Sequence, residues 1–146
     1  MKKAHKEIIC LLLAVSLFSS FFYVSATMAR TSSTMNYYSA SLSTAENGKI
    51  SISASITGRG FCSKIGISHV YIYESSDGGK TFTLYDSYFS SNYPSMMSSG
   101  YKYLETPISF TGTIGYQYKA TVYCCATYDS ENDTKTYKTN IVTARH

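Results

Sequence analysis

The chain has 146 residues, a net charge of +4 and an aromatic content of 15%, with 15 Tyr and no Trp. Without residues 1–26, which contain three Lys and one Glu, ten basic and eight acidic side chains remain, a net charge of +2. This weak and unclustered positive charge argues against nucleic acid as a partner.

The first 29 residues are predicted to be a secretory signal peptide. A basic start precedes an apolar run over residues 8–24, and small residues follow it. Cleavage is expected after Ala26 or after Ala29; the alternative is an uncleaved membrane anchor, because the run approaches the length that spans a bilayer. We expect a secreted, extracellular protein without membrane attachment after cleavage, whose residues 30–146 form one domain.

The rest of the chain has the pattern of β-strands. From Asn36 onward apolar residues recur with a period of two, and turn signals rich in Gly, Asn and Asp separate the alternating segments. The predicted strands are residues 37–43, 49–57, 64–74, 80–89, 103–111, 116–128 and 134–144. Seven short strands in a domain of this size predict an all-β fold, an antiparallel seven-stranded sandwich.

One short motif lies between two predicted strands. Residues 75–82 read SSDGGKTF and fit S-x-D-x-G-x-T-[FW], which resembles the Asp-box of sialidases and related β-propellers. Asp77 can accept hydrogen bonds from backbone amides, Gly78 and Gly79 allow positive φ, and Phe82 is expected to return to the core. A sialidase also needs several blades and an arginine cluster, so the motif predicts a hairpin turn and not a hydrolase.

The longest irregular segment covers residues 90–101. Connections of this length are often functional, and Tyr93, Met96, Met97 and Tyr101 would place apolar and aromatic surface on it. The alternative is a loop that folds back over the open edge of the core.

The stretch GTIGYQYKATVYCCATY resembles the sixth strand of immunoglobulin-like and fibronectin type III-like sandwiches, with Tyr116 or Tyr118 as the tyrosine of their corner. The whole chain also resembles small exported proteins of Gram-positive bacteria that have no assigned function. The first resemblance implies a seven-stranded sandwich of this type, and the second implies no activity.

Three cysteines remain after the predicted signal peptide. In a sandwich of the resembled type the second and sixth strands face each other and run in the same direction, which implies a disulfide between Cys62 and Cys124. Cys125 would then be a free thiol on the other face of its strand, either reactive or half-buried beneath neighbouring Tyr side chains.

The sequence contains no catalytic or metal-binding motif, so we expect neither an enzyme nor a cofactor. His69 has no Cys, Asp or Glu at ligand spacing. The acidic run from Asp129 to Asp133 lacks the central Gly and terminal Glu of a calcium loop, and it is predicted to be a solvated turn.

The favoured function is binding of a protein or glycan surface. An antiparallel sandwich leaves sheet faces in contact with solvent, and Tyr provides contact area at low entropic cost. The predicted binding residues on the sheet are Tyr71, Tyr73, Tyr85 and Tyr123. The alternatives are a structural or self-associating component of the cell envelope, and a small hydrolase or inhibitor.

Overall fold

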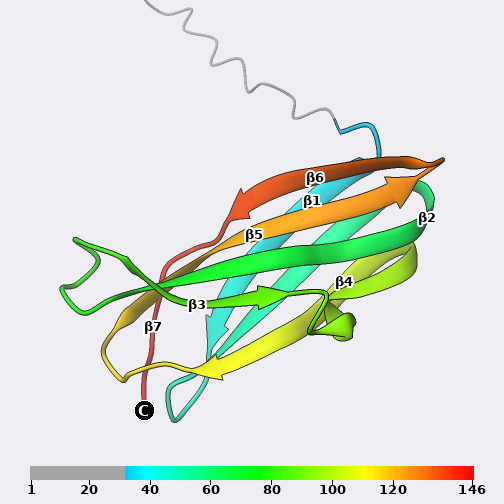
Figure 1. The fold of residues 1–146 in the computed structure, drawn as a ribbon. Coiled ribbons are helices and arrows are strands. Elements are labelled where there is room, and N and C mark those ends of the chain that lie inside the picture. Colours follow the sequence, from blue (N-terminus) through cyan, green and yellow to red (C-terminus); the bar gives the residue numbers. More distant parts are fainter. Residues whose placement is uncertain (1–31) are drawn as a thin grey trace, which may run out of the picture. The chain divides into compact units, whose positions relative to one another are not determined.

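The computed structural model describes residues 32–146, most of which are in β-strands (Figure 1). The predicted signal peptide and both cleavage positions, Ala26 and Ala29, lie outside these residues. Among the described residues no helix is long and apolar enough to cross a membrane.

Seven strands form one antiparallel, curled sheet. A short 3-10 helix, η1 (Pro94–Met96), precedes the fourth strand. In chain order the strands are β1 (Met35–Thr44), β2 (Lys49–Ser75), β3 (Thr83–Phe89), β4 (Met97–Thr111), β5 (Gln117–Tyr128), β6 (Glu131–Lys138) and β7 (Val142–Thr143).

The long strand β2 connects the two layers of the curled sheet. Its first part pairs with β1 and β4, where Ile52 lies opposite both Leu42 and Ile108. Its second part pairs with β3 and β5, where Val70 lies opposite Tyr88 and Val122, and β6 continues from β5. Figure 1 shows β2 running out along one layer and returning along the other.

The predicted break between residues 57 and 64 is therefore wrong, because Gly58-Arg59-Gly60 lies inside β2 and is not a turn. A Cβ at Gly58 would lie 2.5 Å from the Cys62 sulfur, and one at Gly60 would lie 2.3 Å from the Tyr128 ring. The two glycines thus let neighbouring side chains pack against the backbone where β2 bends. The pairing with β4 shifts register at the same place, between Thr57 and Cys62.

The core lies between the layers and is built from alternating inward residues. On β5 five alternating side chains point inward and are at most 2% exposed: Tyr118, Ala120, Val122, Cys124 and Ala126. Facing residues include Ile50, Ile52 and Ile56 of β2 and Tyr103 and Ile108 of β4. The residues between these inward positions form the outer faces of the sheet.

Candidate functional site

An aromatic cluster covers part of the outer face of the layer β3-β2-β5-β6. The ring of His69 stacks on Tyr123 with centroids 3.8 Å apart and lies parallel to Phe89 at 5.9 Å. Tyr71 meets all three of these rings edge-on, at 5.5 to 6.2 Å. The strands fix this arrangement, because His69 lies directly opposite both Phe89 and Tyr123 in the ladders.

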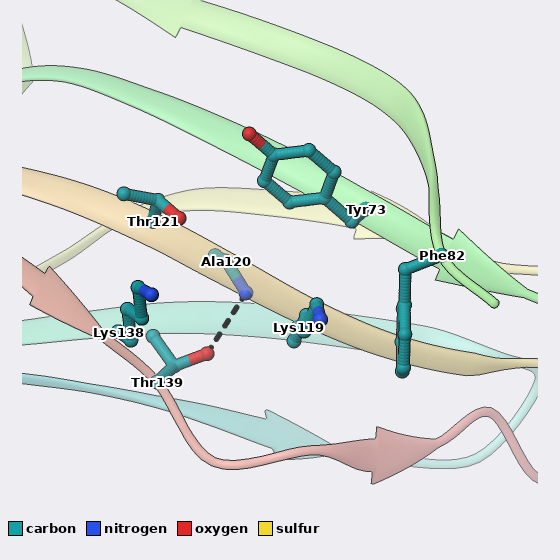
Figure 2. Close-up of a pocket in the computed structure, with 7 residues that line it drawn as sticks. All are labelled: Tyr73, Phe82, Lys119, Ala120, Thr121, Lys138 and Thr139. Atoms are coloured by element: carbon teal, nitrogen blue, oxygen red, sulfur yellow. Dashed lines mark hydrogen bonds between the residues drawn. The ribbon is translucent and has the colours of Figure 1, made fainter. Parts of the chain in front are cut away.

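A pocket of about 330 Å³ lies along the same strands (Figure 2). Tyr73 and Lys119 are a directly opposed pair of β2 and β5, and Tyr71 and Thr121 are the next pair on this face. Lys138 at the end of β6 lies opposite Thr121. The pocket is lined by Tyr73, Phe82, Lys119, Ala120, Thr121, Lys138 and Thr139.

The turn motif places Phe82 at this pocket. The Asp77 carboxylate accepts hydrogen bonds from the Ser75 hydroxyl at 2.6 Å, the Thr81 hydroxyl at 2.6 Å and the amides of Lys80 and Thr81 at 3.0 Å. These hydrogen bonds hold the pKa of Asp77 well below its usual range, and the bond from Ser75 has the largest effect. The predicted hairpin turn is present, with positive φ at Gly78 and Gly79.

The sequence predicted that Phe82 returns to the core, and this prediction is wrong. Its ring lies on the outer face, with its centroid 3.8 Å from the ammonium nitrogen of Lys119. This distance is that of a cation–π contact, which fixes the ammonium group at the pocket. Figure 2 shows the ring of Phe82 beside Lys119.

Two threonines supply hydroxyl groups to the pocket. The Thr139 hydroxyl accepts a hydrogen bond from the Ala120 amide and donates one to the Asn140 carbonyl, both at 2.9 Å. These bonds fix the chain at the floor of the pocket, where β5 and the end of β6 diverge (Figure 2).

Three of the four sheet tyrosines that the sequence singled out share this face. Tyr71, Tyr73 and Tyr123 are half-buried there. Tyr85 lies elsewhere, because β3 shifts register beside Tyr73, and its ring packs on Phe110 and Tyr118 at 5.5 Å. Its hydroxyl donates to the Thr111 carbonyl at 3.1 Å, so Tyr85 connects β3 to β4.

The loop residues of the sequence prediction do not join the pocket. Met96 is fully buried in the core, and the ring of Tyr93 packs on Tyr88 at 5.1 Å. The Met97 sulfur lies 3.6 Å from the Cys125 sulfur, and Tyr101 is exposed beside Phe61 at 5.5 Å. Met96 thus covers the core, whereas Tyr93 and Tyr101 keep aromatic surface exposed, so the segment has features of both predicted alternatives.

The expected disulfide is not formed, since Cys62, Cys124 and Cys125 are all free thiols in the described part of the chain. Cys124 lies opposite Ile67, which is five residues along β2 from Cys62. Cys62 instead lies opposite Gly100 of β4, so the two cysteines belong to different strand pairs. Cys125 is 7% exposed, and burial raises the pKa of its thiol.

The imidazole of His69 has a polar neighbour on the same strand. The Ser68 hydroxyl lies 3.0 Å from its Nδ1, and burial lowers the pKa of the imidazole. No group of three or more His, Cys, Asp and Glu that could hold a metal ion occurs among residues 32–146.

Five pocket residues were not predicted from the sequence: Phe82, Lys119, Thr121, Lys138 and Thr139. The signal for two of them was present, since Lys119 and Thr121 share the parity of Tyr123 along β5. Phe82 could not be placed, because its direction depends on how the hairpin leaves β2.

Comparisons with protein-family models, with curated proteins and with solved structures found no match for this chain.

Proposed function

We propose that this protein is an exported, non-enzymatic binding domain that recognises a glycan through the pocket beside Tyr73 and Phe82. The observation that carries the proposal is the meeting of aromatic rings, hydroxyl groups and ammonium groups in one pocket of about 330 Å³. Ligand sites combine apolar and aromatic walls with a few polar groups in this way. Aromatic rings can stack on the C–H faces of sugars, while hydroxyl and ammonium groups bond to sugar oxygens.

We further infer that the fold is a sandwich of the immunoglobulin-like and fibronectin type III-like kind. The order β1, first part of β2, β4 in one layer and β3, second part of β2, β5, β6 in the other supports this inference. Export is supported by the basic and apolar start of the sequence.

Glycan-array binding of the full chain tests the function. Tyr73→Ala and Phe82→Ala are each expected to weaken binding about fivefold or more, as expected for aromatic residues that anchor a ligand. Tyr37→Ala is the matched control, because Tyr37 is 54% exposed on β1, in the other layer. The proposal fails if no glycan binds, or if binding survives both pocket substitutions unchanged.

A further inference from the structure

We propose that the ligand of this pocket is an acidic saccharide, whose sugar rings carry carboxylate or sulfate groups. The inference rests on the proposed glycan-binding function and goes one step further, to the charge of the ligand.

The pocket contains two charged side chains, Lys119 and Lys138, and no acidic residue lines it. The single ion pair among residues 32–146 joins Lys135 to Asp133 at 3.1 Å. Neither pocket lysine therefore has a carboxylate within ion-pair distance in this part of the chain. Two cations that lack such a partner give the pocket a positive potential, which favours an anionic ligand.

The carboxylates on the surrounding strands are engaged elsewhere. Glu74 lies next to Tyr73 in β2, but its carboxylate accepts a hydrogen bond from the core hydroxyl of Tyr118 at 3.2 Å. Asp77 is occupied by the hydrogen bonds of its own turn. Asp86 of β3 lies beside Tyr88. Burial raises the pKa of Tyr88 to about 12, and the Asp86 carboxylate is the next largest cause. None of these groups is among those that line the pocket.

The two lysines also have the placement that an acidic sugar needs. In Figure 2 Ala120 and Thr139 lie between Lys119 and Lys138, so the ammonium groups flank the floor of the pocket. Phe82 holds the Lys119 ammonium at 3.8 Å from its ring centroid. A sugar ring over this floor would present its acidic substituent to one ammonium group while an aromatic ring contacts its C–H face.

The test is calorimetric titration of the full chain with three hexasaccharides: chitohexaose, which is neutral, hyaluronan, which carries carboxylates, and keratan sulfate, which carries sulfates without uronic acid. We expect at least one acidic probe to bind about tenfold or more tightly than the neutral one, as charge-assisted hydrogen bonds to a lysine allow. Which acidic probe binds identifies the anion. The affinity should also fall as the salt concentration rises from about 0.05 to about 0.5 M.

Lys119→Gln and Lys138→Gln separate the two levels of the proposal. Each should remove most of the preference for the acidic probe over the neutral one, whereas Lys102→Gln, on exposed β4 surface, should leave that preference unchanged. Equal affinity for neutral and acidic probes overturns the inference and leaves the glycan-binding function standing. Failure of all three probes, together with a glycan array that retains nothing, overturns both.

Discussion

His69 is a half-buried imidazole between aromatic rings, and its titration is expected to couple to folding. Burial lowers the pKa of His69, so the folded protein favours the neutral ring. At a pH above the unfolded value of about 6.5 both states are neutral and the stabilisation is complete. Below that pH the unfolded state binds the proton first, so the free energy of unfolding decreases as the pH falls. The decrease ends once the pH is below the lower pKa of the folded state.

Thermal unfolding between pH 8 and pH 5 measures this coupling. We expect the wild type to lose more stability over this range than His69→Phe, which keeps a ring between Tyr123 and Phe89 but cannot titrate. Parallel curves for the two proteins would show that the imidazole does not contribute.

The three described cysteines are expected to be unreactive thiols in the folded protein. Cys62 and Cys124 are fully buried, and burial raises the pKa of Cys124 to about 12. Because the thiolate is the reactive form, iodoacetamide near pH 8 should leave Cys62, Cys124 and Cys125 unmodified. Denaturation without a reductant should then expose all three to alkylation, as peptide mapping can show. A peptide pair linked by a sulfur bridge would contradict the structure.

The β2–β3 hairpin is held by one carboxylate, and its integrity should determine the position of Phe82. Asp77→Ala removes four hydrogen bonds at once, two of them from the amides of Lys80 and Thr81. We expect hydrogen exchange at these amides to become several-fold faster. Glycan binding should weaken in parallel, since the ring of Phe82 is no longer fixed beside Lys119.

A carboxylate in another turn provides the control for this experiment. Glu46 lies between β1 and β2, so Glu46→Ala should leave both exchange at Lys80 and glycan binding unchanged. Faster exchange at Lys80 in Asp77→Ala with full binding would mean that Phe82 is positioned by its own packing and not by the turn.

Much of this element structure follows from local sequence. Alternation predicted the strands on either side of the hairpin, and the chemistry of Asp77, Gly78 and Gly79 predicted the turn itself. The side on which Phe82 emerges was not predictable, because it depends on the register of β3 against β2. Likewise, Gly58 and Gly60 are typical of a turn in the sequence. In the structure they lie within β2 and leave space for Cys62 and the Tyr128 ring, which the sequence could not show.

The segment before β4 closes the core, and Met96 is its buried anchor. Met96 is fully buried, and a Cβ at Gly66 would lie 2.2 Å from its carbonyl oxygen, so the segment packs directly on β2. Met96→Ala should lower the free energy of unfolding by about 2–5 kcal/mol, as loss of a buried Met side chain does. Denaturant unfolding measures this free energy. Met97 is partly exposed, so Met97→Ala is the control and should cause a smaller loss. Equal losses would contradict the anchoring role.

Because β2 contributes to both layers, the described domain is expected to unfold as one cooperative unit. The first part of β2 places Ile52 between β1 and β4, and the second places Val70 between β3 and β5, without an intervening turn. Neither layer keeps its central strand if the other is lost, so partial unfolding would expose the core that they share. Native-state hydrogen exchange should give the amides of Ile52 and Val70 the same opening free energy, equal to that of global unfolding.

Gly60→Val tests whether the bend in β2 transmits this coupling. The new side chain would collide with the Tyr128 ring, and overpacking of this kind costs about 1–3 kcal/mol. If β2 links the layers, the amides of Ile52 and Val70 should lose the same amount of protection from hydrogen exchange, although Gly60 is adjacent to neither residue. If the amide of one part exchanges faster while the other keeps its wild-type rate, the two layers are separate folding units and the bend in β2 is only a linker between them.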